Sequence, residues 1–283
     1  MTNTPSTTVT PARHRTGWHA LILLPMVALL AASCACSAAP LVDANGAGNV
    51  YAGSVRKYGS ASDQRIEVLQ PGKRNGPVLL SIVGGGYHGL NTDVTPEIAK
   101  AKSDSWRVLQ LTYTPGTVNS VEAQVDTGLA WVAANTDWAA WGDLGNLRVA
   151  GESAGGQAAV RGVLKNTAYK TTKVYSLAGT TELDEWYRHW AGNPIGIDDT
   201  IKMVTSCGTP TWRSCGTVRD ASPRTHFRSG PRVTFIHGRQ DGMVPISVSR
   251  LSHERFPGPS TLREVDGNHF DATFVRNLAP QIT

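Results

Sequence analysis

The chain has 283 residues, of which 40% are hydrophobic and 17% are charged. Its formal net charge is +5 at pH 7, and its Lys and Arg residues are spread along the chain without a basic block. The charge pattern therefore does not indicate a nucleic-acid partner. About 250 residues remain once the N-terminal segment described next is removed, a length within the range of one α/β domain with its own core.

The first 33 residues resemble an export signal. Arg13 and Arg15 precede an uncharged, largely apolar run over residues 20–32. A basic stub before an apolar stretch of this length is typical of a secretory signal peptide. A membrane-spanning helix needs about 20 apolar residues, whereas this run contains Pro25 and gives way to small residues. We therefore predict cleavage and a secreted or cell-envelope location.

Cys34 directly follows three small residues, Ala31-Ala32-Ser33. This arrangement is similar to a bacterial lipobox, in which the cysteine becomes the lipidated first residue, although Ala31 stands where the lipobox usually has Leu. Two interpretations stay open. Either Cys34 carries a lipid that associates the protein with a membrane, or the signal is cleaved in the ordinary way within residues 33–39.

The rest of the chain indicates an α/β fold with a mostly parallel sheet covered by helices on both faces, because short apolar runs alternate with helical patterns. Residues 34–62 are rich in Gly, Ala and Ser and are predicted to be a linker, with the folded domain covering 63–283. The repeat of Val125, Leu129 and Val132 predicts a helix with one face on the sheet. The predicted strands, the first of them the candidate for an antiparallel one, are residues 65–69, 78–83, 107–113, 147–151, 173–178, 232–237 and 262–265.

Residues 180–230 interrupt this alternation. A structureless loop of that length is unusual in a compact domain, so we expect a cap-like insertion over the active site with short helices of its own. Cys207 and Cys215 are predicted to form a disulfide, because an exported protein meets an oxidising compartment and a metal site would need further ligands nearby. The pattern leaves open whether the aromatic residues line a pocket or fill a small core; they are Trp186, Tyr187, Trp190 and Trp212.

The sharpest signal is Gly151-Glu152-Ser153-Ala154-Gly155-Gly156, between a predicted strand and an Ala/Val-rich helical stretch. A serine on a tight strand-to-helix turn needs glycine two positions before and after it, since side chains there would clash with the neighbouring strand and helix. The sequence therefore predicts a nucleophile elbow with Ser153 as nucleophile. The N–H of Ala154 would point at the reacting centre from the first turn of the helix and is a candidate oxyanion donor.

A run of three glycines, Gly84-Gly85-Gly86, follows the strand predicted at residues 78–83. Consecutive glycines let the backbone approach a ligand with its N–H groups exposed. Gly85 and Gly86 are therefore the predicted partners of Ala154 in the oxyanion hole. A phosphate-binding loop is excluded because no Lys-Ser or Lys-Thr pair follows the glycines.

A serine hydroxyl needs a base to take its proton, and that base needs an acid to orient it. Asp241 follows the strand predicted at residues 232–237, and His269 follows the last predicted strand. The chain order Ser153, Asp241, His269 is the order of the α/β-hydrolase fold, with each residue in a loop after its own strand. His237 lies too close to Asp241 in sequence to be the expected base, and a surface or structural role is favoured for the remaining candidates, which are His189, His226, His253, Asp220 and Asp271.

These motifs resemble the esterase/lipase group related to hormone-sensitive lipase and the feruloyl-esterase-like hydrolases. The family's His-Gly-Gly-Gly turn corresponds to residues 83–86, with Val83 in place of His. Its Asp-x-x-Val-Pro motif corresponds to Asp241, Val244 and Pro245. Residues 111–115, Leu-Thr-Tyr-Thr-Pro, stand where relatives usually have Tyr-Arg-Leu-Ala-Pro. The resemblance implies an α/β-hydrolase fold, carboxylesterase activity and a small-molecule ester as substrate.

The sequence thus predicts a serine hydrolase in which Ser153 attacks an acyl carbonyl, His269 transfers the proton and Asp241 orients His269. No cofactor or metal is implied. Three alternatives stay open: a serine peptidase on the same fold, a lipase acting on longer chains, and a non-catalytic envelope protein that keeps the fold for its pocket.

Overall fold

The computed structural model describes residues 52–72, 76–92, 95–135, 142–169, 172–227, 229–269, 271–278 and 281–282. All of them belong to one compact unit that covers residues 39–283. The predicted signal, Cys34 and its lipidation, and most of the predicted linker lie outside the described residues.

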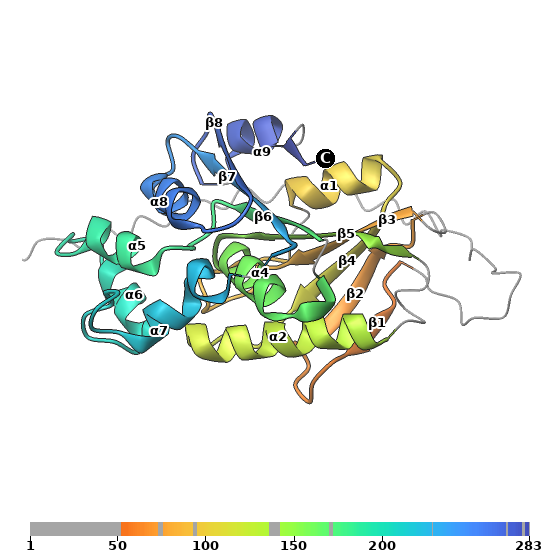
Figure 1. The fold of residues 1–283 in the computed structure, drawn as a ribbon, viewed down its shortest axis with the longest axis horizontal. Helices are drawn as coiled ribbons and strands as arrows, with labels where there is room; N and C mark the ends of the chain where they lie inside the picture. The colour runs from red at the N-terminus through yellow and green to blue at the C-terminus, as the bar shows by residue number, and fades with distance from the viewer. Residues whose placement is uncertain are drawn as a thin grey trace, which may run out of the picture. The chain divides into compact units, whose positions relative to one another are not determined.

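A mixed sheet of eight strands forms the centre of this unit, in the order β1-β2-β4-β3-β5-β6-β7-β8 (Figure 1). β1 and β2 are antiparallel to their neighbours, while the pairs from β4 through β8 are parallel. The strands are β1 (Val55–Lys57), β2 (Arg65–Gln70), β3 (Gly76–Ile82), β4 (Arg107–Thr112), β5 (Gly142–Glu152), β6 (Lys173–Leu177), β7 (Arg232–Gly238) and β8 (Ser260–Val265).

The seven predicted strands are all present, and the first of them, β2, is antiparallel as expected. The sheet nevertheless begins earlier than Asp63, because β1 lies within residues 34–62, which were predicted to be linker. β1 consists of Val55, Arg56 and Lys57, all exposed, and it joins the sheet through backbone pairing with β2. An exposed three-residue edge strand buries no side chains, so it leaves no hydrophobic pattern in the sequence.

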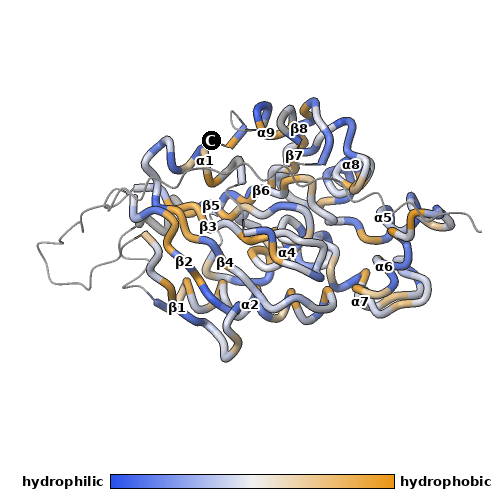
Figure 2. The backbone as a smooth tube through the Cα atoms, turned by 180° about the vertical axis from the view of Figure 1, so that it is seen from behind, coloured by the Kyte–Doolittle hydropathy of each residue, from blue (hydrophilic) through white to orange (hydrophobic). Residues whose placement is uncertain are grey.

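Helices cover both faces of the sheet (Figure 1). α1 (Pro96–Ser103) and α9 (Ala272–Leu278) share one apolar cluster with Leu79 of β3, whereas α2 (Val118–Ala134) and α4 (Ser153–Lys165) share the other with Val78 and Leu80. Because helices cover both faces, most residues of β3 are apolar. Figure 2 shows this as hydrophobic colouring along the strand. The short helix η1 (Thr167–Tyr169) leads into β6, and α8 (Ser247–Arg255) connects β7 to β8.

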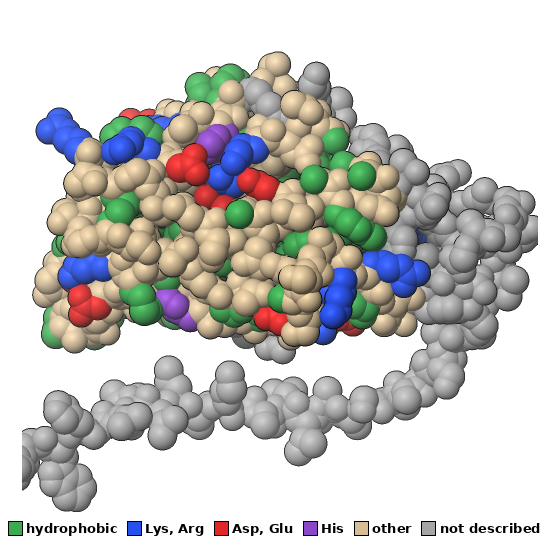
Figure 3. Space-filling view, turned by 90° about the horizontal axis from the view of Figure 1, so that it is seen from below, with side chains coloured by type: hydrophobic (Ala, Val, Ile, Leu, Met, Phe, Trp, Pro, Cys, Tyr) green, Lys and Arg blue, Asp and Glu red, His purple; other side chains and the backbone are tan. Residues whose placement is uncertain are grey.

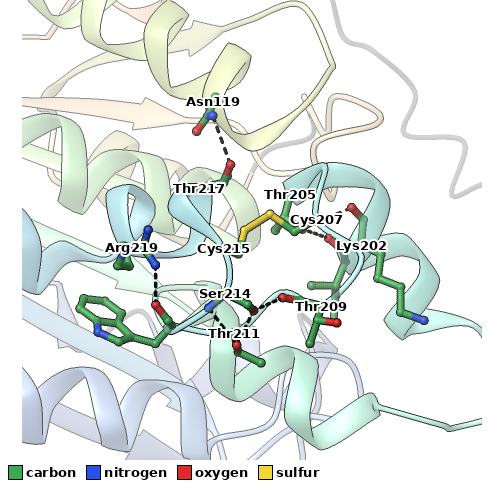
Figure 4. The surroundings of a disulfide bond; sticks show 12 residues. Asn119, Lys202, Thr205, Cys207, Thr209, Thr211, Ser214, Cys215, Thr217 and Arg219 are labelled. Carbon is green, nitrogen blue, oxygen red and sulfur yellow. Dashed lines mark hydrogen bonds between the residues drawn. A yellow bond between two sulfur atoms is a disulfide. The ribbon is translucent and has the colours of Figure 1, made fainter.

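The predicted insertion consists of short helices, as expected: α5 (Leu183–Trp190), α6 (Ile197–Thr205), α7 (Gly216–Ala221) and η2 (Pro223–His226). Cys207 and Cys215 form the predicted disulfide (Figure 4). Cys215 is buried and belongs to the main apolar cluster, so the disulfide attaches the loop between α6 and α7 to the core.

The face of the molecule seen in Figure 3 carries acidic and basic side chains close to one another, without a field of one sign. This agrees with the absence of a basic block in the sequence. Within the described part of the chain, no helix is long and apolar enough to cross a membrane.

Candidate active site

The turn from β5 into α4 positions Ser153. Ser153 has a φ of 50° and is 9% exposed. A Cβ on Gly155 would lie 2.3 Å from the carbonyl oxygen of Ile82, and one on Gly151 would lie 2.3 Å from the carbonyl oxygen of Gly155. Both contacts are with backbone and are far below van der Waals distance, so a side chain at either position would force the backbone to move. The positive φ of a non-glycine residue is the strain expected of a nucleophile elbow.

The glycine turn after β3 lies beside this elbow. A Cβ on Gly84 would meet the carbonyl oxygen of Glu152 at 2.9 Å, so close approach of the two segments again depends on glycine. Gly85 and Gly86 have φ angles of 120° and 63°. The carbonyl of Gly85 accepts hydrogen bonds from the two N–H groups of His88 and Gly89, which closes the turn.

The buried side chain of Tyr87 attaches the same turn to Gln157 and Thr180. It is fully buried, with a φ of 69°, and its hydroxyl lies 3.2 Å from Oε1 of Gln157 and 3.0 Å from Oγ1 of Thr180. Burial raises the pKa of Tyr87 well above its usual range, so the hydroxyl stays protonated and can donate. The backbone N–H of Thr180 in turn donates to the carbonyl of Ser153 at 3.3 Å.

Asp241 lies in the loop after β7, with its side chain fully buried. Its Oδ1 accepts the backbone N–H groups of Met243 at 2.9 Å and Val244 at 2.8 Å. Its Oδ2 lies 2.7 Å from Nδ1 of His269 and 3.2 Å from Nε2 of His237. The structure therefore brings together the predicted acid and base, and it adds a second histidine that the sequence reasoning had set aside.

Burial alone would raise the pKa of Asp241, but hydrogen bonds from His237 and His269 outweigh it and hold the pKa of this carboxyl well below its usual range. Asp241 is therefore a carboxylate at neutral pH. An ionised acid bonded to Nδ1 leaves Nε2 of His269 as the nitrogen that can take a proton.

The loops that carry Asp241 and His269 are tied to each other. Oδ1 of Asn268 accepts the N–H of Gly242 at 2.8 Å and the N–H of His269 at 2.7 Å. The backbone N–H of Gln240 donates to the carbonyl of Gly267 at 3.1 Å. The separation between acid and base is thus set by backbone contacts as well as by the imidazole–carboxylate bond.

Two tryptophans of the insertion contact the acid loop. The indole N–H groups of Trp186 and Trp190, one helical turn apart on α5, both donate to the carbonyl of Met243, at 2.9 and 3.0 Å. Both rings are buried in the main apolar cluster. The sequence left open whether these aromatic residues line a pocket or fill a core. The structure shows that Trp186 and Trp190 fill the core and also hold the acid loop.

The remaining histidines and acids, for which the sequence favoured a surface or structural role, have structural partners. His253 Nδ1 lies 2.7 Å from Oγ of Ser260, and His226 Nε2 is bonded to the carbonyl of Asp220. His189 packs edge-on against Trp190. Asp271 accepts the N–H of Phe274 at the start of α9. None of these contacts involves the loops that carry Ser153 or Asp241.

The sheet order, the strand–serine–helix turn and the sequential loops after β5, β7 and β8 define an α/β-hydrolase fold. A scan of protein-family models gives no match to the sequence, and neither does a search of curated proteins.

Solved structures do match, and they agree on this fold. A truncated carbohydrate esterase from gut microbiota has a TM-score of 0.63 and 15% identity, over 81% of this chain and 94% of that one. An acetyl ester-xyloside bifunctional hydrolase from Caldicellulosiruptor lactoaceticus gives 0.62 and 15%, over 82% and 94%. Esterase 2 of Thermogutta terrifontis, phosphonylated by sarin, gives 0.56 and 17%, over 81% and 90%.

Proposed function

We propose that the protein is an exported serine hydrolase that cleaves carboxylic esters through an acyl-enzyme on Ser153. The observation that carries the proposal is the contact at 2.7 Å between His269 and the buried carboxyl of Asp241, in a fold whose turn from β5 into α4 carries Ser153. Three loops at the carboxyl ends of parallel strands supply the serine, the acid and the base, as acyl transfer by this fold requires.

In the proposed reaction, Nε2 of His269 takes the proton of Ser153 as Oγ attacks the acyl carbonyl. The imidazolium that forms is stabilised by Asp241 and then protonates the leaving alcohol. The N–H groups of Gly85, Gly86 and Ala154 would stabilise the oxyanion. Water, deprotonated by His269, then releases the acid and restores Ser153.

Two features support the assignment of the oxyanion donors. The N–H groups of Gly85 and Gly86 donate none of the hydrogen bonds found between loops in the described part of the chain. Ala154 lies in the first turn of α4, where an N–H has no acceptor within the helix. An acyl oxygen could therefore occupy donors that the fold leaves free.

The substrate class is inferred from the solved structures with the same fold. Two of the three carry names that specify esters of carbohydrates, and the third was phosphonylated, a reaction expected of an activated nucleophile. We infer short acyl esters, acetylated saccharides among them, as the substrates to test first. The disulfide is compatible with a secreted or envelope location, and a lipid on Cys34 remains a proposal that mass spectrometry of the mature protein would test.

The test is labelling by a fluorophosphonate probe together with hydrolysis of p-nitrophenyl esters from acetate upwards and of acetylated xylo-oligosaccharides. Ser153→Ala and His269→Ala should abolish labelling and turnover. Matched controls are Ser103→Ala and His253→Ala, since Ser103 is exposed on α1 and His253 contacts Ser260 on β8. If folded wild-type protein neither labels nor hydrolyses any ester, the hydrolase proposal is wrong; if it cleaves only peptide bonds, the substrate class is wrong.

A further inference from the structure

His237, the sixth residue of β7, is fully buried and has both ring nitrogens engaged. Its Nε2 lies 2.8 Å from the carbonyl oxygen of Val244 and 3.2 Å from Oδ2 of Asp241, and its Nδ1 lies 2.7 Å from Oγ of Ser249. A ring with no exposed surface cannot reach a substrate. Its chemistry must act through the groups that it contacts.

These contacts fix the tautomer of His237. A carbonyl and a carboxylate only accept hydrogen bonds, so Nε2 must carry a hydrogen and share it between Val244 and Asp241. In a neutral ring, Nδ1 then has a lone pair that accepts the hydroxyl of Ser249. The neutral ring is therefore satisfied at both nitrogens and points one N–H at the carboxylate of Asp241.

Oδ2 of Asp241 is consequently held between two imidazoles. The loop N–H groups of Met243 and Val244 fix only the other oxygen, Oδ1. Without His237, the oxygen that orients His269 would have no second donor among its described partners. The contact also connects the acid to the strand and to α8, because Ser249 belongs to that helix.

We propose that His237 is a positioning residue of the catalytic centre, which through its Nε2–H holds Oδ2 of Asp241 where it binds Nδ1 of His269. The proposal rests on the serine hydrolase activity proposed above. The opposing view is that His237 only fills core and stabilises the loop. The two views differ in what they expect for the pH dependence of turnover.

Removal of the donor concentrates negative charge on Asp241, which favours the protonated form of His269 over the neutral form that takes the proton of Ser153. In His237→Leu we therefore expect the acidic limb of kcat/KM against pH to move to higher pH. We also expect kcat to fall roughly 10- to 100-fold, with KM changed less than about twofold, because the base is misplaced rather than substrate binding lost. Rates are normalised to the sites that react with fluorophosphonate, which removes the contribution of unfolded protein.

The chain offers a matched control. His253 on α8 makes the same contact as His237, with Nδ1 at 2.7 Å from a serine hydroxyl, but it does not contact Asp241. His253→Leu should therefore leave the acidic limb in place. Ser249→Ala, which removes the partner of Nδ1 and loosens the hold on the His237 ring, should shift the limb in the same direction as His237→Leu with a smaller loss of kcat. An unmoved limb in both site variants, or an equal shift in His253→Leu, would overturn the proposal.

A second measurement does not depend on turnover or on a variant that folds poorly. In ¹⁵N-histidine spectra of the wild-type protein, His237 should be neutral, with its hydrogen on Nε2 and slow to exchange, and that signal should move in Asp241→Asn. A hydrogen on Nδ1, or an Nε2 signal insensitive to Asp241→Asn, would contradict the inference. Wild-type protein without esterase activity would instead contradict the proposed function, while this measurement still tests the contact.

Discussion

Gly155→Ala is a direct test of the elbow geometry. The added Cβ would lie 2.3 Å from the carbonyl oxygen of Ile82 and 2.4 Å from that of Val83. Ordinary contact begins at 3.4 Å, so the start of α4 must move by about 1 Å, because neither carbonyl can rotate away as a side chain would. Overpacking of this kind lowers the free energy of unfolding by about 1–3 kcal/mol. The higher helix propensity of Ala over Gly offsets ~1 kcal/mol of that loss.

The loss should therefore appear in turnover more than in stability. A displacement of about 1 Å at a reacting group can reduce the rate about 100-fold, so kcat on p-nitrophenyl acetate should fall by about that factor, while the free energy of unfolding should fall by at most about 2 kcal/mol. Gly208→Ala is the control, since its Cβ would meet nothing within 4 Å. A Gly155→Ala protein with kcat within about threefold of wild type would refute the steric reasoning.

Three further perturbations follow from the structure. Replacement of both Cys207 and Cys215 by Ala releases a loop with a sequence separation of 8, worth about 2.5 kcal/mol by loop entropy, and urea unfolding should show that loss. Burial raises the pKa of Glu122 to about 7 despite its contact with an arginine, so its folded form retains a proton that the unfolded form loses from about pH 4.5 upwards. Deprotonation of Glu122 in the unfolded state therefore lowers the free energy of unfolding as pH rises from 4.5 to 7. Glu122→Gln should make the free energy of unfolding depend less on pH. An unchanged dependence between pH 5 and 7.5 would contradict a raised pKa for Glu122. Trp190→Phe removes one hydrogen bond to the acid loop, so it should lower the free energy of unfolding by about 1 kcal/mol and also lower kcat. An unaltered kcat would show that the indole of Trp186 alone holds the loop.

Much of the fold could be predicted from sequence because its local signals agree with one another. Each parallel strand is covered on both faces and so appears as an apolar run. The elbow is visible because Gly151 and Gly155 meet backbone, and only glycine satisfies that contact. Asp241 and His269 could be chosen because the fold places each after its own strand.

The parts that could not be predicted are contacts between segments far apart in sequence, or segments without a buried pattern. β1 is an exposed edge strand and has no hydrophobic repeat. His237 was set aside because it lies four residues before Asp241, yet the turn after β7 folds the carboxylate back onto the ring, at 3.2 Å. The role of Trp186 and Trp190 depends on the position of one carbonyl, which no spacing rule reveals.

These missed contacts converge on the loop that follows β7. His237 holds it from the strand, Asn268 from the loop after β8, and Trp186 and Trp190 from the insertion. The insertion therefore supports the loop that carries the proposed catalytic acid. Because the disulfide closes the loop between α6 and α7 within the insertion, its reduction should lower kcat together with stability. Formation of this disulfide would then support the proposed active site as well as stabilise the fold.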